Sequence, residues 1–131
     1  LLANPSDLGI HNIICREQQA IFFDFEYAGH DSYLKCLMDF CLHPANGLNI
    51  NRISEINKNF ALALDINPLA LSSLIIRTFC LWWVLRLLNS LEETAIKQRV
   101  LMGVLVDREI SSYIDQRYEQ SKFFWKLVQS Y

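Results

Sequence analysis

Glycine and proline are scarce in this chain, and no Gly-x-Gly stretch occurs. Four Gly and three Pro among 131 residues, with 52% hydrophobic side chains, exclude a low-complexity, collagen-like or intrinsically disordered chain. At this length, folding can bury roughly two-thirds of the surface of the unfolded chain, so a core can form without disulfides or structural metals. We therefore expect one globular domain over residues 1–131.

The chain also lacks an excess of charge of one sign. Twelve Lys and Arg side chains and 14 Asp and Glu side chains give a net charge of −2. The basic residues are scattered singly, whereas a protein that binds a phosphate backbone gathers them in a patch or stripe. We therefore expect no nucleic-acid partner.

The cysteines show no metal-binding or disulfide pattern. The chain has four, at positions 15, 36, 41 and 80, and no Cys-x-x-Cys spacing. Cys41 has His43 as a near neighbour, but no second Cys/His pair repeats the pattern that a zinc site needs. Free, mostly buried thiols in a reducing cytoplasm are therefore the better interpretation, with zinc as the weaker alternative.

No charge-free run is long enough to span a bilayer. The most apolar stretch, residues 69–88, contains Arg77 and Arg86. A spanning helix needs about 20 nearly charge-free residues, and an arginine at mid-bilayer costs on the order of 3 kcal/mol. We expect a helix of a helical domain there, with both arginines at a surface or paired with an acid. No secretory signal is recognised, and the expected location is the cytoplasm.

Hydrophobic periodicity predicts a mainly α-helical fold with one small β-hairpin near its start. The hairpin is expected from two short runs rich in β-forming residues, 13–15 and 20–23. Four helical segments follow in the three- and four-residue periodicity. They are expected over 32–42 with Asp31 as N-cap, over 53–64, from Pro68 to about 91, and from about 92 to 128 with a break near Gly103.

The residues with the strongest chemical signal lie in the first forty. Asp7 and Asn12 have the Asp-x-x-x-x-Asn spacing of a kinase catalytic loop, in which the Asp accepts a hydroxyl proton and the Asn binds magnesium. Asp24 follows the second predicted strand, and a strand end is a rigid mount for a carboxylate that binds Mg²⁺. In this hypothesis Asp7 is the base, while Asp24 anchors the metal that neutralises charge on the transferring phosphoryl group.

Three segments resemble the aminoglycoside phosphotransferase and choline kinase family. They are NPSDLGIHN at 4–12, FDFEYAG at 23–29 and Asp39-Phe40. The resemblance covers residues 4 to about 44 and implies the helical C-terminal lobe of a protein-kinase-like fold. Residues 1–29 would supply the catalytic and metal-binding loops, and residues 30–131 the helical subdomain.

The resemblance also implies a role for each of four site residues. By it, Asp7 is the catalytic base, Asn12 and Asp24 ligate Mg²⁺, and Asp39 braces the catalytic loop through backbone amides. The implied enzyme transfers a phosphoryl group from ATP to a hydroxyl of a small molecule. An aminoglycoside, choline, a sugar and homoserine all remain open as the acceptor.

The chain departs from the family pattern in what it lacks. Pro5 stands where the family usually has a His, and Glu26 stands where protein kinases have a Gly. The Gly-rich strand and turn that cover ATP are absent, and all five lysines lie after the site. We therefore expect the C-terminal lobe of a longer enzyme, inactive without its N-terminal lobe. The alternatives are a non-catalytic pseudokinase-like or interaction module and a purely structural helical bundle.

Three further groups of residues admit a functional and a structural interpretation. An aromatic cage for a quaternary amine is possible at Phe79, Trp82 and Trp83, although core packing is favoured there. A base at His11 and ligands at His30 and His43 are the functional alternatives, but His11 is interpreted as a loop side chain, and His30 and His43 as capping or surface residues. A polyamine-like substrate or a solvated helix face would explain the acids of the C-terminal half, Glu92, Glu93, Asp107, Glu109, Asp115 and Glu119.

Overall fold

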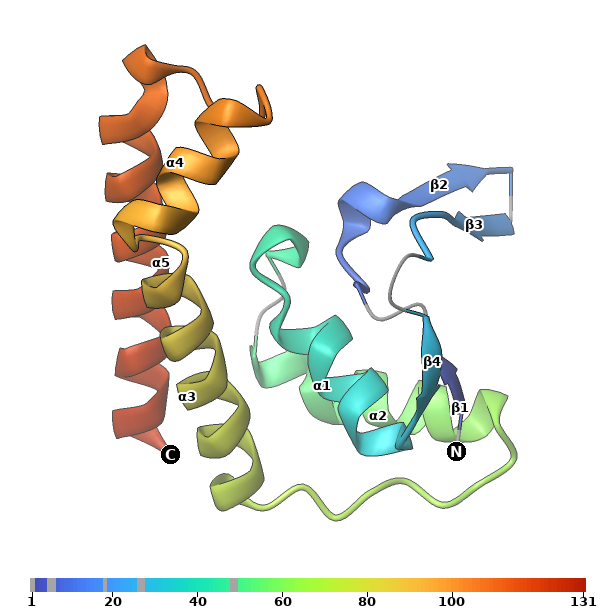
Figure 1. Ribbon diagram of the computed structural model, residues 1–131. Helices are drawn as coiled ribbons and strands as arrows, with labels where there is room; N and C mark the ends of the chain where they lie inside the picture. The colour runs from blue at the N-terminus through green and yellow to red at the C-terminus, as the bar shows by residue number, and fades with distance from the viewer. Residues whose placement is uncertain (1, 5–6, 18, 26–27, 48–49) are drawn as a thin grey trace. The chain divides into compact units, whose positions relative to one another are not determined.

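The computed structural model describes residues 2–4, 7–17, 19–25, 28–47 and 50–131 (Figure 1). The chain divides into two compact units, Leu1–Leu71 and Ser72–Tyr131, which we call unit 1 and unit 2. The described residues form five α-helices and two two-stranded sheets, so the expected mainly helical class with a small β component is confirmed. The expectation of a single domain stays a prediction.

Both sheets belong to unit 1. Strand β1 (Leu2–Asn4) pairs antiparallel with β4 (Gly29–Asp31), with Leu2 opposite Asp31. Strands β2 (Ile13–Arg16) and β3 (Gln19–Phe22) form an antiparallel hairpin in which Ile13 faces Phe22. The hairpin expected from the sequence is thus confirmed. The β1–β4 pair was not predicted, because three-residue strands carry no readable alternation.

Helix α1 (Tyr33–Leu42) follows β4 and forms the centre of unit 1. Its N-cap is Ser32, whose hydroxyl accepts the Lys35 amide hydrogen at 3.1 Å. The sequence prediction of Asp31 as N-cap was wrong, because Asp31 is the last residue of β4. The helix ends before Pro44, as expected, and buries three side chains almost fully: Leu37, Met38 and Cys41.

Helix α2 (Ile53–Ala63) packs against α1 and lies within the predicted range. Phe60 provides much of the contact, with its ring 5.8 Å from Phe40 and 6.5 Å from Tyr33, centroid to centroid. The 3₁₀ turns η2 (Pro44–Asn46) and η3 (Ile50–Arg52) lie between α1 and α2. Aromatic and aliphatic burial therefore holds the two helices of this unit together.

The segment around Pro68 is not helical, contrary to the sequence prediction. Buried Asn57 accepts the Leu69 amide hydrogen at 3.2 Å and donates its amide nitrogen to the Leu69 carbonyl at 2.8 Å. Because both backbone groups of Leu69 are occupied by a side chain, they cannot enter a helical ladder. Helix α3 (Ser73–Asn89) begins instead at a better cap, Ser72, whose hydroxyl accepts the Ile75 amide hydrogen at 3.4 Å.

The C-terminal part of the chain forms two helices separated at Gly103, as the sequence predicted. Helix α4 (Glu93–Leu101) ends in a Schellman motif, with Gly103 at φ 70° and the Val104 amide donating to the Arg99 carbonyl at 2.9 Å. A short 3₁₀ turn, η4 (Asp107–Glu109), precedes helix α5 (Ile110–Ser130). Glycine fits this break because a side chain disfavours positive φ.

Unit 2 is built on the packing of α3 along α5. Trp83 stacks on Phe124 with centroids 6.1 Å apart, and both side chains are buried. Trp82 meets Trp83 edge-on at 5.0 Å and stays partly exposed. Core packing, the favoured interpretation of this aromatic group, is therefore confirmed for Trp83.

The arginines of α3 lie at the surface of unit 2, as expected. Arg77 and Arg86 are both exposed, and the Arg86 guanidinium lies 5.1 Å from the ring centroid of Trp82 and 5.4 Å from that of Trp83. No single helix among the described residues has the length and apolarity to cross a membrane. Helices α3 and α4 pass that test only as a pair, by length and composition, with a bend of 66° between them.

Three of the four cysteines are buried free thiols, as the sequence suggested. Cys36, Cys41 and Cys80 are buried, and Cys15 on β2 is exposed. Burial raises the pKa of Cys41 to about 12 and that of Cys80 to about 11. These two thiols therefore stay protonated and unreactive at neutral pH.

Candidate functional site

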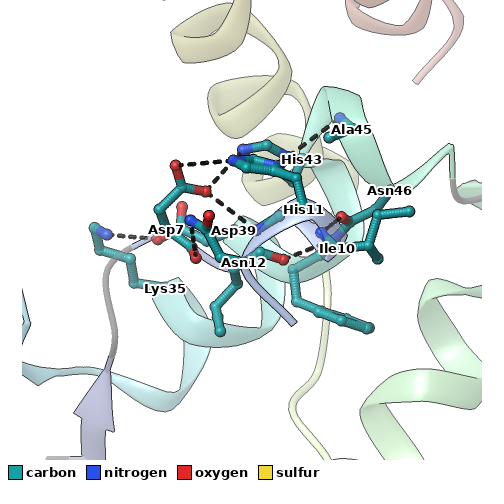
Figure 2. A network of polar contacts seen from close by, with 12 residues as sticks. Asp7, Ile10, His11, Asn12, Lys35, Asp39, His43, Ala45 and Asn46 are labelled. Atoms are coloured by element: carbon teal, nitrogen blue, oxygen red, sulfur yellow. Dashed lines mark hydrogen bonds and ion pairs between the residues drawn. The ribbon is translucent and has the colours of Figure 1, made fainter. Parts of the chain in front are cut away.

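The loop from Asp7 to Asn12 is closed by hydrogen bonds among its own residues (Figure 2). Oδ1 of Asp7 accepts the Gly9 amide hydrogen at 3.1 Å, and the Asn12 amide donates to the Gly9 carbonyl at 2.9 Å through the turn η1 (Ile10–Asn12). The Asn12 side chain, which is buried, donates its amide nitrogen to the Asp7 carbonyl at 3.4 Å. The first and last residues of the predicted catalytic loop are therefore in direct contact.

Asn46 joins this loop to the end of α1. Its side-chain oxygen accepts the Ile10 amide hydrogen at 2.7 Å, and its nitrogen donates to the carbonyls of Leu8 at 3.0 Å and Phe40 at 2.7 Å. One carboxamide thus satisfies three backbone groups in two segments that are at least 30 residues apart along the chain. The sequence did not single out Asn46, because nothing in a Pro-Ala-Asn-Gly turn indicates a long-range partner.

Asp24 is held at the base of the hairpin, next to Asn12. The Phe23 amide donates to the Asn12 carbonyl at 3.1 Å, which extends the β2–β3 ladder by one step and leaves Asp24 directly after it. Asp24 is exposed and has a φ of 64°, a conformation that is uncommon for any residue other than glycine. Backbone conformations of this kind often occur at functional sites. Asp7, Asn12 and Asp24 therefore share one end of the hairpin.

Asp39 lies buried on α1 and accepts a hydrogen bond from Lys35. The Lys35 ammonium is 2.5 Å from Oδ2 of Asp39 and 3.2 Å from Oδ2 of Asp31, so it bridges two carboxylates. Burial alone would lower the pKa of Lys35, but the hydrogen bonds and charges of Asp39 and Asp31 raise it above its usual value. The bracing of the loop by Asp39 through backbone amides stays a prediction.

Two histidines approach the Asp7 carboxylate, which the sequence did not indicate. Nε2 of His43 lies 3.1 Å from Oδ1 of Asp7, and Nε2 of His11 lies 3.6 Å from Oδ2 (Figure 2). His43 also caps η2, as a capping interpretation predicted, by accepting the Ala45 amide hydrogen on Nδ1 at 3.1 Å. The contact of His43 with Asp7 spans 36 positions, and no local pattern encodes it.

Asn12 and Asp24, which lie on either side of the hairpin base, carry oxygen donors of the types that magnesium takes. The Asn12 amide nitrogen is engaged with Asp7, which leaves the amide oxygen as a possible ligand, and Asp24 offers an exposed carboxylate. Mg²⁺ takes oxygen ligands and usually binds one or two protein carboxylates together with water and substrate phosphates. The donor types at Asn12 and Asp24 are therefore ones that Mg²⁺ accepts.

A cavity of about 550 Å³ lies within unit 1 and borders the loop at Leu8. Four aromatic side chains line much of it, from Phe22, Phe25, Phe40 and Phe60. Its polar lining among the described residues comes from Asn4 and Asn59. A cavity with this lining suits an apolar group rather than the phosphates of a nucleotide.

The remaining candidates of the sequence lie outside this site or outside the described residues. A guanidinium already lies against Trp82 and Trp83. The six acids of the C-terminal half are exposed, and two of them pair with lysines, Glu93 with Lys97 and Glu119 with Lys122. This arrangement favours the solvated-face interpretation. The departures at Pro5 and Glu26 lie outside the described residues.

Comparison with known proteins gives no match. No family model matches the chain, and neither a curated protein nor a solved structure does. The resemblance to the aminoglycoside phosphotransferase and choline kinase family rests on the motifs around Asp7, Asn12 and Asp24.

Proposed function

We propose that unit 1 carries the catalytic and metal-binding loops of an ATP- and Mg²⁺-dependent phosphotransferase that acts on a hydroxyl of a small molecule. The observation that carries the proposal is the hydrogen bond from the Phe23 amide to the Asn12 carbonyl, at 3.1 Å. It ties the loop of Asp7 and Asn12 to the strand end of Asp24. A phosphoryl-transfer site needs a base and two metal ligands of these types at one place.

Each residue has a distinct part in the proposed reaction. Asp7 orients the acceptor hydroxyl and takes its proton, while Asn12 and Asp24 hold the metal. When bound, Mg²⁺ neutralises charge on the phosphate oxygens of ATP. The bonds of Gly9 and Asn12 to Asp7 keep the base in place, which lowers the entropic cost of reaching a reactive geometry.

The proposal assigns the chain to the C-terminal lobe of a kinase-like enzyme in the cytoplasm. An N-terminal lobe would then hold ATP, because the chain has no Gly-x-Gly stretch and no lysine before Lys35. The acceptor stays open among an aminoglycoside, choline, a sugar and homoserine. The test therefore uses the full-length protein.

Asp24 and Asp65 provide a matched pair for this test. Both are exposed aspartates with positive φ, 64° and 53°, and asparagine tolerates that conformation as well as aspartate does. We expect Asp24→Asn to lower Mg²⁺-dependent transfer from ATP by on the order of 100-fold, as for the loss of one electrostatic stabiliser. Asp65→Asn should leave transfer unchanged.

Release of ADP, measured with each acceptor class over a range of Mg²⁺ concentrations, distinguishes the outcomes. Transfer that depends on Mg²⁺ and fails only in Asp24→Asn supports the proposal. Equal transfer by both variants removes Asp24 from the metal site. A folded full-length protein that releases no ADP with any acceptor points instead to a non-catalytic module.

A further inference from the structure

The two ring nitrogens of His43 face two different partners. Nδ1 accepts the amide hydrogen of Ala45 at 3.1 Å, and Nε2 lies 3.1 Å from Oδ1 of Asp7. The side chain is only 13% exposed and directly follows α1, whose last residue is Leu42. Both ends of the ring are therefore held by named partners on two separate segments of unit 1.

These contacts determine which nitrogen carries the proton. A nitrogen that accepts a hydrogen bond has no proton, so Nδ1 is the bare nitrogen of the neutral ring and Nε2 is the N–H. The group that faces Asp7 is therefore a donor. Oδ1 of Asp7 accepts the Gly9 amide hydrogen and lies 3.1 Å from Nε2 of His43.

Among the residues that the structure describes, the other carboxylate oxygen, Oδ2, has no contact as short as these. Nε2 of His11 is 3.6 Å from Oδ2, beyond ordinary hydrogen-bond range, and the His11 side chain is 52% exposed. The two carboxylate oxygens therefore differ: the contacts of Oδ1 hold the orientation of the Asp7 side chain, and Oδ2 can accept a proton. A general base on a loop needs both properties, a fixed orientation and an oxygen that can take the proton.

Gly9 leaves room for the imidazole rings of His11 and His43, whose centroids are 5.4 Å apart. A Cβ at Gly9 would lie 2.3 Å from a ring carbon of His11 and 2.7 Å from a ring carbon of His43. Both distances are far inside van der Waals contact, so a side chain at this position would displace the rings. The absence of a side chain at position 9 is therefore part of the arrangement around Asp7.

We propose that His43 is a positioning residue for the base, donating its Nε2–H to Oδ1 of Asp7 so that Oδ2 faces the acceptor hydroxyl. This inference rests on the proposed function. His43 fixes the rotation of the Asp7 carboxylate from a different element, at the end of α1, while Gly9 does so from within the loop. Misplacement of a catalytic group by a small distance costs about 100-fold in rate, which is the scale of effect that such a residue controls.

A metal ion is the competing explanation for this cluster. The ligand atoms of Asp7, His11 and His43 all lie within 4.8 Å of one another, and two His with one carboxylate are a ligand set that Zn²⁺ accepts. A metal on Nε2 of His43 would need the lone pair there, whereas the bond from Ala45 already uses the lone pair of Nδ1. A neutral imidazole has only one such nitrogen, so the observed bonds favour the hydrogen-bond donor.

The first test reads the tautomer directly and does not depend on activity. Long-range ¹H–¹⁵N correlation spectra of the ¹⁵N-labelled chain distinguish protonated from bare ring nitrogens. We expect the Nε2–H form for His43, with His30, which is exposed on β4, as the internal comparison. A His43 ring in the Nδ1–H form, or one that shifts together with His11 on addition of one equivalent of ZnCl₂, would overturn the proposal.

The second test compares His43→Gln with His43→Leu in the full-length protein. Both variants lose the imidazole, but only glutamine keeps a side-chain N–H that can replace the Nε2–H donor. We expect His43→Leu to lower kcat by about 10- to 100-fold with an unchanged KM for ATP, and His43→Gln to recover most of that loss. Circular dichroism checks that both variants fold.

The outcomes separate this inference from the proposed function. A wild-type protein that transfers phosphate while His43→Leu keeps the same kcat contradicts the role of His43 alone. Equal losses in the leucine and glutamine variants assign His43 to structure and not to positioning. If the wild type shows no transfer while His43 has the Nε2–H form, the geometry holds and the proposed function fails.

Discussion

The interactions that stabilise unit 1 internally differ in kind from those that stabilise unit 2. In unit 1, Asn46 and Asn57 form side-chain hydrogen bonds to backbone groups 6 to 38 residues away. In unit 2, the hydroxyls of Thr78, Ser90 and Ser121 bond only three or four residues back along their own helices. There, stacked rings and aliphatic side chains provide the contact between α3 and α5.

The difference follows from the backbone that each unit has to satisfy. A helix pairs most of its own N–H and C=O groups, whereas short strands and loops leave many of them unpaired. Asparagine can donate and accept at once, and eight of the nine asparagines of the chain lie in unit 1. The candidate site is in the unit where side chains, and not helical ladders, fix the backbone. Side-chain hydrogen bonds of this kind support the loop residues of the site and limit their movement.

The largest expected effect concerns Asp7. In Asp7→Asn, the side-chain oxygen can still accept from Gly9 and His43, so the loop should keep its geometry while losing its base. We expect transfer by the full-length protein to fall by about 100- to 10,000-fold, the usual contribution of a general base. The measurement is kcat at saturating ATP, with the thermal midpoint as a control for folding. A folded variant with wild-type kcat would remove Asp7 from the chemistry.

A substitution of Phe124 tests whether apolar packing between α3 and α5 stabilises unit 2. Its ring is 4% exposed and stacks on Trp83, so Phe124→Ala should lower the free energy of unfolding of unit 2 by about 3–5 kcal/mol. Its neighbour Phe123 is 54% exposed, and Phe123→Ala should cost less than about 1 kcal/mol. Urea unfolding followed by tryptophan fluorescence reports on unit 2, which contains all three tryptophans of the chain. Similar losses in the two variants would contradict the assigned core.

A substitution of Asn57 tests whether side-chain hydrogen bonds to the backbone stabilise unit 1. Asn57→Ala leaves both backbone groups of Leu69 without their partner, and each buried group that stays unsatisfied costs about 1–3 kcal/mol. Asn59→Ala, at an exposed position of the same helix that borders the cavity, should change stability by about 0.5 kcal/mol or less. Hydrogen exchange should show faster exchange in Asn57→Ala for peptides of unit 1 only. Equal acceleration in unit 2 would show that the two units open together.

The local features of the fold were predictable from the sequence, because they depend on neighbouring residues. The hairpin follows from two β-rich runs, α1 from its apolar periodicity, and the end of α4 from Gly103, whose φ of 70° suits glycine. The start of α3 was not predictable from Pro68, because the competing bonds come from Asn57 in another helix. Errors thus arose where a distant side chain determines the backbone.

The residues of the candidate site also fall into two groups, those that the sequence predicted and those that only the fold reveals. Asp7 and Asn12 are five residues apart and were found by their spacing, and Asp24 was found because it ends a strand. His43 and Asn46 come from the segment after α1, and only the fold brings them to the loop. Their spacing to Asp7 depends on the length of the hairpin and of α1, so no short motif can encode it.

The reactivity of the cysteines tests, residue by residue, which side chains are protected from solvent in each unit. We expect a thiol reagent at pH 8 to modify exposed Cys15 within minutes and to spare Cys41, whose pKa burial raises to about 12, and Cys80, whose pKa it raises to about 11. Peptide mass spectrometry assigns the modified sites. In urea, labelling of Cys41 reports the opening of unit 1, and labelling of Cys80 reports that of unit 2. Rapid native labelling of either buried thiol would contradict the described cores.

The smallest expected effect is the pH dependence that Asp31 gives to unit 1. Burial is the largest single influence and opposes its ionisation, but the hydrogen bonds from Lys35, the Ser32 amide and Asn4, together with the charge of Lys35, hold its pKa below the ordinary value of 3.8. A carboxylate with a lowered pKa in the folded state stabilises that state above the ordinary value, and the gain is lost as the pH falls below it. Asp31→Asn keeps the acceptor for Ser32 and removes the charge. Wild type should therefore be more stable than this variant at pH 6, and the difference should vanish near pH 2. A difference of equal size at both pH values would show that the charge of Asp31 does not contribute.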